Sequence, residues 1–257
     1  MLAPEAASLE LSPILEAYRA QGWARLGRIL SDEGIATLRA RADDIMQGRV
    51  DPAGFFFQHD MTTGRYEDLE IGRGWVGPSD SYRKIEKLER DEVFRVWIEN
   101  ALFERVARAW IGGDIVLYRA ILMTKAATGG TVLPWHQDAG SFWGLDRDPT
   151  LQLWTALDDA PLDGGCVEVV TGSHLAGLAT PLGGMIPDAI AATRAGEALP
   201  LPARAGEGLL LHNLVWHRSG TSRTGRPRRA FSVCLMSAET RCLRRRRAPR
   251  TFPRLFV

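Results

Sequence analysis

The stretch IVLYRAILMT, residues 115–124, is a short run of β-branched and large apolar residues that begins soon after Gly112 and Gly113. Four further runs of the same kind follow, separated by clusters of Gly, Pro and Asp: residues 151–157, 166–170, 209–216 and 230–237. Repeated short strands with turn residues between them are typical of an all-β sandwich or barrel. The sequence therefore predicts a mainly β fold for residues 113–240.

The first 112 residues carry helix signals instead. Apolar residues recur at helical spacing in residues 31–45 and again in residues 93–109, so the sequence predicts one helix in each stretch. Between them, residues 50–81 combine several glycines with the cluster Phe55-Phe56-Phe57. This composition fits either a surface loop or a lid over a pocket.

The chain shows no linker, which predicts a single domain over residues 1–257. Its expected parts are a helical region with the lid loop (1–112), a β core (113–240) and a basic C-terminal tail (241–257). We expect this tail to be a solvated extension, and an electrostatic contact with a partner is the alternative.

The composition excludes several classes of protein. The chain has 257 residues with 32 Lys and Arg against 31 Asp and Glu, and this balance argues against a nucleic-acid partner, which needs a basic face. The most apolar stretch, residues 111–123, is interrupted by Asp114 and Arg119 and is too short to span a membrane. The three cysteines are too scattered for a disulfide framework or a Cys-based zinc site, and no secretory signal is visible. We expect a cytoplasmic protein without membrane contact, either a monomer or a homodimer.

The first residues that suggest chemistry are His136 and Asp138, in the sequence LPWHQD. Residues i and i+2 of a strand point to the same face, so the imidazole and the carboxylate are presented together. They are two-thirds of a 2-His-1-carboxylate facial triad, which binds Fe(II) and leaves positions open for ligands. Alone, the pair also fits a surface strand or a core histidine bonded by the carboxylate.

His217 is the best candidate for the third ligand, because it follows the apolar run of residues 209–216 just before a turn. His212 lies five residues earlier and faces the other way on a regular strand, which predicts a structural role. His59 and His174 lie in expected loops or turns and are weaker candidates.

Arg228 opens the next predicted strand after a glycine-bearing turn. A guanidinium in this place can bind a carboxylate through two hydrogen bonds. The alternative is an exposed arginine cluster beside the turn, formed with Arg226 and Arg229.

The order of these motifs resembles the phytanoyl-CoA dioxygenase family, whose members are Fe(II)/2-oxoglutarate-dependent oxygenases. The resemblance extends from about Leu9 to Glu239, and it rests on HQD (136–138), WTALDDA (154–160), DGG (163–165), TGSH (171–174), HRSG (217–220) and Arg228. It implies a double-stranded β-helix, also called a cupin-like jelly roll, with the N-terminal helices packed on one sheet. One departure is Ser222, which stands where many members have Asn.

The resemblance also implies roles for individual residues. Those that would bind iron are His136, Asp138 and His217, with no catalytic residue beyond the metal centre. Those that would bind the co-substrate 2-oxoglutarate are Arg228 and Ser219, on its far carboxylate, and Lys125 and Trp154, which would line its pocket.

The implied reaction uses O2 to convert 2-oxoglutarate to succinate and CO2 and to hydroxylate an unactivated C–H bond of a small-molecule metabolite. Asp138 favours hydroxylation, because related halogenases carry a small residue in its place. Desaturation or cyclisation are alternatives within this chemistry. Outside it, a non-catalytic jelly-roll protein that binds a metal or ligand and a cupin-like isomerase are the alternatives.

Aromatic residues near the metal motif and in the expected lid predict a substrate pocket with apolar or aromatic walls. The residues assigned to this pocket are Phe57, Trp135, Gln137, Phe142 and Trp143. Packing of the aromatics in the core is the alternative.

Overall fold

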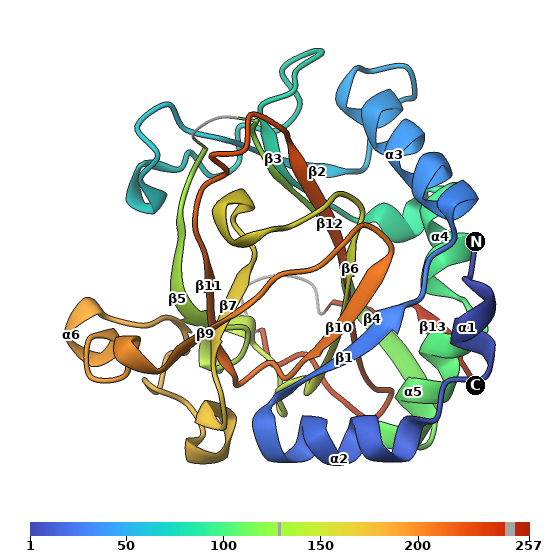
Figure 1. Ribbon diagram of the computed structural model, residues 1–257, viewed down its shortest axis with the longest axis vertical. Coiled ribbons are helices and arrows are strands. Elements are labelled where there is room, and N and C mark those ends of the chain that lie inside the picture. The colour runs from blue at the N-terminus through green and yellow to red at the C-terminus, as the bar shows by residue number, and fades with distance from the viewer. Residues whose placement is uncertain (128–129, 245–249) are drawn as a thin grey trace.

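The core of the protein consists of two sheets, as the computed structural model shows for residues 1–127, 130–244 and 250–257 (Figure 1). The eight-stranded sheet has the order β1 (Trp23–Arg28), β10 (Glu207–Leu211), β6 (Leu151–Ala156), β12 (Arg228–Ser237), β4 (Ile115–Lys125), β3 (Tyr82–Glu86) and β2 (Phe56–His59), and β13 (Arg254–Phe256) also pairs with β4. The five-stranded sheet has the order β8 (Gly184–Met185), β5 (Leu133–Gln137), β11 (Trp216–Ser219), β7 (Val167–Val170) and β9 (Ala198–Leu201).

Apolar side chains from both sheets fill part of the space between them, among them Trp154, Leu209 and Val169. The paired strands of both sheets are antiparallel. This arrangement confirms the mainly β prediction with a jelly-roll core.

The N-terminal helices lie against the outer face of the larger sheet (Figure 1). The α-helices are α1 (Pro4–Ala7), α2 (Leu11–Gln21), α3 (Asp32–Met46), α4 (Glu92–Ile98), α5 (Ala101–Trp110) and α6 (Asp188–Ala191). The 3-10 helices are η1 (Tyr66–Asp68), η2 (Leu88–Arg90), η3 (Ser141–Trp143), η4 (Leu162–Gly164), η5 (Ser173–Ala176) and η6 (Ala195–Glu197).

The single helix predicted over residues 93–109 is wrong, because the structure divides it into α4 and α5. The side chain of Asn100 accepts a hydrogen bond from the backbone N–H of Phe103 at 3.0 Å, which caps a new helix. The first predicted helix is confirmed as α3, and there the hydroxyl of Ser31 accepts from the N–H of Gly34 at 3.1 Å.

The outer face of the larger sheet is apolar across its width. Phe57, Ile85, Leu122 and Phe231 occupy successive paired positions on β2, β3, β4 and β12, and all four are buried in the main hydrophobic core. Side chains directly opposite one another on paired strands share one face, so this row faces the helices and not the space between the sheets. Polar and charged residues occupy much of the opposite, interior face of the same strands.

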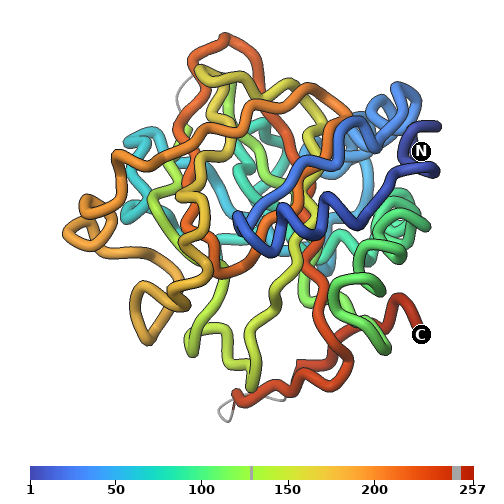
Figure 2. The backbone as a smooth tube through the Cα atoms, turned by 60° about the horizontal axis from the view of Figure 1, so that its bottom comes forward, coloured from blue at the N-terminus to red at the C-terminus, as the bar shows by residue number. Residues whose placement is uncertain are grey.

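The C-terminal segment is not the free extension that we expected. Cys242 forms an isolated β-bridge with Leu145, and the guanidinium of Arg241 pairs with Asp146 at 3.0 Å. Farther along, β13 pairs with β4, so the chain returns to the larger sheet. In Figure 2 the red C-terminal end lies beside the green helical turns of the N-terminal region. The part of the predicted tail at residues 245–249 lies outside the described residues.

Part of the expected loop at residues 50–81 is regular structure, because β2 pairs with β3 within the larger sheet. No helix within the described ranges is long and apolar enough to cross a membrane.

Candidate metal centre

The three predicted metal ligands lie together where β5 and β11 meet. His136 and His217 are directly paired across these strands, and the centroids of their rings are 4.0 Å apart. Asp138 follows β5, and its Oδ2 lies 3.7 Å from Nε2 of His217. One potential ligand atom of each residue lies within 4.8 Å of those of the other two. Among the described residues this is the one such group of three or more His, Cys, Asp or Glu side chains.

Both histidines are oriented by the backbone of their own strands. Nδ1 of His136 lies 2.9 Å from the carbonyl oxygen of Pro134, and Nδ1 of His217 lies 3.0 Å from that of Val215. With the proton on Nδ1, each ring donates to its carbonyl and leaves the lone pair of Nε2 for a metal. Burial and the nearby His217 lower the pKa of His136 to about 3, which keeps this ring neutral.

Asp138 is held at both carboxylate oxygens. Arg119 donates from Nη2 to Oδ1 at 2.9 Å, and Gln152 donates from Nε2 to Oδ2 at 2.9 Å. Burial alone would raise the pKa of Asp138, but the charge of Arg119 holds it well below its usual range. The carboxylate is therefore ionised and oriented, as a metal ligand must be.

Arg119 and Gln152 were not assigned to the site from the sequence. The available signal for Arg119 was a lone charge within the apolar run of residues 115–124, which we interpreted only as an interruption. A cation in a buried strand requires a partner, so that position should have suggested a buried carboxylate.

A second group of polar side chains lies toward the other end of the interior, where Arg228 on β12 is directly paired with Lys125 on β4. Arg228 is only 3% exposed; its Nη2 donates to the carbonyl of Gly165 at 2.6 Å, and its buried Nε has no partner within the described structure. Lys125 donates from Nζ to the carbonyls of Thr131 at 2.9 Å and Ser219 at 3.4 Å.

These two cations are short of counter-charge. Burial lowers the pKa of Lys125 well below its usual range, and the charges of Arg228 and Arg83 lower it further, whereas Asp60 opposes this effect. Burial also lowers the pKa of Arg228 to about 10. Two neighbouring buried cations favour the binding of an anion, since a carboxylate would offset the charge of both.

Two other residues predicted to contact 2-oxoglutarate lie at the interior. Ser219 is two residues beyond His217 on β11 and is buried beside Lys125. Trp154 is buried in the cluster between the two sheets. Their contacts with 2-oxoglutarate stay predictions.

Trp135 and Gln137 do not belong to the interior pocket that we predicted. Both flank His136 on β5, so the alternation of a strand turns them to the opposite face. Trp135 packs against Trp216 in an outer cluster. Gln137 donates to the carbonyls of Gly177 and Leu214 and accepts from the N–H of Ala179. These hydrogen bonds hold two loops against β5.

The prediction for Phe57 is also wrong, because this ring lies on the helix-covered face, 4.8 Å from the ring of Tyr82. Its neighbour Phe56 pairs with Glu86 on the interior side of β2 and β3. The sequence analysis placed Phe57 in an expected lid and could not tell which phenylalanine faces inward, because the register of β2 was not known.

Phe142 and Trp143 differ from each other. Phe142 is 59% exposed, whereas Trp143 is buried. The ring of Trp143 stacks on Tyr118 at 4.6 Å and lies 4.3 Å from the guanidinium carbon of Arg119. Trp143 thus contacts the residue that holds Asp138, and its role toward a substrate stays a prediction.

The other three histidines lie apart from this centre. His212 accepts from the N–H of Leu214, His174 lies 3.0 Å from the carbonyl of Arg19, and His59 lies 3.2 Å from that of Gly74.

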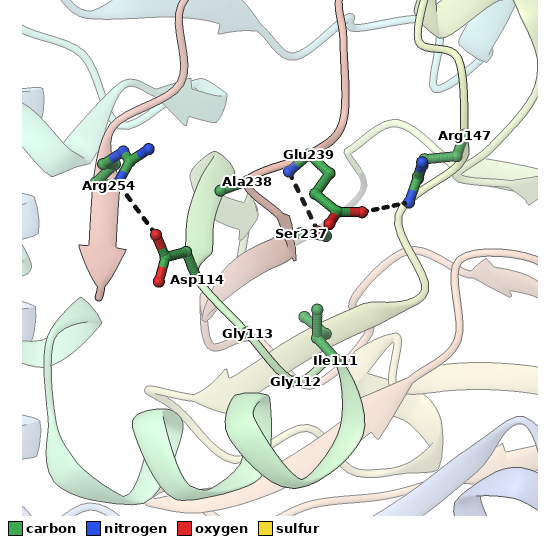
Figure 3. A pocket seen from close by; sticks show the side chains of 9 residues that line it. All are labelled: Ile111, Gly112, Gly113, Asp114, Arg147, Ser237, Ala238, Glu239 and Arg254. Carbon is green, nitrogen blue, oxygen red and sulfur yellow. Dashed lines mark hydrogen bonds and ion pairs between the residues drawn. The ribbon is translucent and has the colours of Figure 1, made fainter.

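A surface cleft of about 530 Å³ is separate from the metal centre (Figure 3). Its charged lining residues are already paired, Asp114 with Arg254 at 3.1 Å and Arg147 with Glu239 at 3.3 Å. None of the three predicted metal ligands lines it.

Comparisons with known proteins agree with this geometry. The family model described as "Phytanoyl-CoA dioxygenase (PhyH)" matches residues 18–230. A mouse protein named phytanoyl-CoA dioxygenase domain-containing protein 1 is 29% identical over 181 residues, which are 66% of this chain and 62% of the relative. L-proline trans-4-hydroxylase from Streptomyces griseoviridis is 24% identical, and the match covers 84% of both chains.

Solved structures share the fold. The non-heme alpha ketoglutarate dependent carbocyclase SnoK from nogalamycin biosynthesis superposes with a TM-score of 0.73 at 21% identity, covering 97% of this chain and 98% of the other. EctD from S. alaskensis, crystallised with 2-oxoglutarate and 5-hydroxyectoine, gives a TM-score of 0.71 at 20% identity, covering 94% and 78%.

Proposed function

The chain belongs to the phytanoyl-CoA dioxygenase family of Fe(II)/2-oxoglutarate-dependent oxygenases, and we propose that it hydroxylates an unactivated C–H bond of a small-molecule metabolite. The reaction would consume O2, place one oxygen atom in the substrate and convert 2-oxoglutarate to succinate and CO2. The observation that carries the proposal is the His136–Asp138–His217 group, with both histidines buried, together with a separate pair of buried cations, Arg228 and Lys125.

The donor set fits Fe(II), because two imidazoles and one carboxylate form the facial triad of non-haem iron oxygenases. His136 and His217 would bind through Nε2, since Nδ1 of each faces a backbone carbonyl. Asp138 would bind through one oxygen while Arg119 orients the carboxylate. Iron held in this way supplies the redox chemistry that activates O2.

The pocket around Arg228 fits the far carboxylate of 2-oxoglutarate. The free Nε of Arg228 and the charge of Lys125 would recognise that carboxylate, and its binding would remove the repulsion between the two cations. Ser219 and Trp154 would complete this pocket from β11 and β6.

The names of the relatives support oxidation of a small molecule. One is a hydroxylase of proline, and this chain matches most of its length. One structural neighbour is named as a carbocyclase. Ring formation is therefore the alternative reaction that we consider for this site.

The decisive experiment is anaerobic addition of Fe(II) and 2-oxoglutarate to the purified protein. We expect a weak visible charge-transfer band that needs both additions. Substrates would then be sought by succinate release from a metabolite panel in air, and mass spectrometry would tell a gain of oxygen from a loss of two hydrogens. Absence of the band would contradict the proposal.

A further inference from the structure

Arg119 is a second interior arginine near the metal ligands, at a distance from the 2-oxoglutarate pocket. It lies on the same face of β4 as Lys125, six residues earlier, which corresponds to roughly 20 Å along a strand. The metal centre lies between them, because Arg119 contacts Asp138 whereas Lys125 contacts Ser219 at the far end of β11.

Arg119 resembles Arg228 in having more donors than partners. A guanidinium carries five N–H donors, but the one hydrogen bond found for Arg119 in the described structure goes to Asp138. Its Nε is buried and has no partner there, as is true of Nε of Arg228. The guanidinium lies over the ring of Trp143, which restricts where it can turn.

The charge balance around Arg119 changes when a metal binds. Asp138 is its direct counter-ion at 2.9 Å, and a bound Fe(II) would draw on the same carboxylate. The other nearby anion, Glu86, is already paired with Lys84 at 2.5 Å on β3. The loaded site would thus contain a guanidinium that is largely removed from water and short of negative charge, which favours an anionic ligand.

This side of the metal centre is also the more accessible one. The side chains of Lys84, Glu86, Arg119 and Asp138 keep between 17% and 24% of their surface exposed, whereas Arg228 is 3% exposed as a residue. A ligand can therefore reach Arg119 without displacing 2-oxoglutarate from its pocket.

We propose that Arg119 anchors the primary substrate, and that this substrate is a carboxylic acid whose carboxylate binds the free edge of the guanidinium. This inference rests on the proposed oxygenase function and names the substrate class for it. In place of the pocket with apolar or aromatic walls, it predicts one with a charged wall at Arg119, Lys84 and Glu86 and an aromatic wall at Trp143.

The test uses the protein loaded anaerobically with Fe(II) and saturating 2-oxoglutarate. Matched pairs of acid and amide serve as probes: acetate with acetamide, and benzoate with benzamide. We expect the acids to shift the charge-transfer band at concentrations where the amides do not. Arg119→Gln should weaken the response to acids about tenfold or more, because it removes a charge-assisted contact. Arg119→Lys keeps the charge and should retain part of the preference for acids.

Arg218 provides a matched control on the outer face. It also lies over a tryptophan, Trp135, and also pairs with a carboxylate, Glu168 at 2.8 Å. Arg218→Gln should therefore respond to acids as the wild type does.

Equal responses to acids and amides would overturn the proposal, as would no response to the acids or an unchanged response in Arg119→Gln. If Arg119→Gln no longer forms the band, Arg119→Lys decides: loss of its preference for acids overturns the proposal, and retention supports it. Absence of the band in the wild type would instead contradict the oxygenase function itself.

Discussion

The two faces of the larger sheet are formed by the same strands but differ in the polarity of their side chains. On the outer face, the row from Phe57 to Phe231 is apolar and fully buried under the helices. On the interior face of the same strands lie Arg119, Lys125 and Arg228. Burial of the outer row stabilises the fold without any further partner.

The interior face instead carries a free-energy cost, because Lys125 and Arg228 are removed from water with few counter-ions. An anion that binds between Lys125 and Arg228 would offset that cost. The outer face therefore accounts for the fold, and the interior face for its chemistry. Substitutions on the two faces should separate stability from ligand binding.

The largest expected effect is on the interior face. His217→Ala should abolish Fe(II) binding and turnover, because two remaining ligands do not hold the metal in a facial triad. Its free energy of unfolding should stay within about 1 kcal/mol of the wild type, since the ring takes no part in the apolar core. The charge-transfer band, succinate release and urea denaturation measure the three quantities. Normal turnover by this variant would disprove the ligand set.

The converse substitution is Phe231→Ala on the outer face. We expect a loss of about 3–5 kcal/mol in the free energy of unfolding, the usual cost of truncating a buried Phe. The folded fraction should bind 2-oxoglutarate as the wild type does. Urea denaturation and titration of the charge-transfer band test these points, and Phe231→Leu is the milder variant if Phe231→Ala does not fold. A stability loss below about 1 kcal/mol would contradict the assignment of this row to the core.

A smaller effect is expected at the co-substrate pocket. Arg228→Lys should raise the KM for 2-oxoglutarate about tenfold or more, because lysine keeps the charge but not the paired donors. The neighbouring Arg229 is the control, since its guanidinium faces the other way and pairs with Asp158 at 2.8 Å and Asp43 at 2.6 Å. Equal KM values for Arg228→Lys and the wild type would show that another residue binds the carboxylate of 2-oxoglutarate.

The sequence predicted that His136 and Asp138 share one face because the alternation of a strand is a local property, and the structure brings His217 to them. The same alternation excludes Trp135 and Gln137 from the pocket, since both flank His136, and applying it there would have avoided the error. Phe57 is different in kind. Which phenylalanine of β2 faces inward depends on the pairing with β3, and this register is set by a partner strand more than 20 residues away in the sequence.

The pocket chemistry was the hardest part to predict. Arg119, Gln152 and Lys84 come from three separate strands, and no spacing in the sequence brings them to Asp138. Their roles became clear only once the sheet order placed β3, β4 and β6 around the interior.

A pH-dependent effect is expected at the contact between α2 and the sheets. Burial and the nearby His174 lower the pKa of His212 to about 4. The unfolded chain takes up this proton near pH 6.5, so stability is complete above that pH and falls as the pH drops toward 4. The loss from this residue should reach up to about 3 kcal/mol.

His212→Asn should flatten this decline, because Asn keeps an acceptor for the N–H of Leu214 but does not titrate. Urea denaturation at pH 7.5 and pH 5 measures the difference. An equally steep decline in the variant would assign the pH dependence to other groups, of which His136 is the first candidate.

The smallest effect concerns the part of the expected lid that follows β2. This segment touches the approach to the cationic pocket: the N–H of Met61 donates to Thr131 at 3.1 Å, and the carbonyl of Gly64 accepts from Val132 at 3.0 Å. Because Thr131 also accepts from Lys125, a ligand that occupies the pocket should tighten these contacts. We therefore predict that the segment closes over the active site when iron, 2-oxoglutarate and substrate are bound.

Limited trypsin digestion tests this closure at Arg65 and Arg73, two exposed arginines of the segment. Their side chains pair with the nearby Asp68 and Glu70. Cleavage there should slow severalfold when all three ligands are present, because a closed segment must open before it enters the protease. Cleavage at the exposed Arg204, before β10, should not change and serves as the internal control. Equal rates at Arg65 and Arg73 with and without ligands would make the segment a passive surface loop, and exclusion of water would then have to come from the substrate itself.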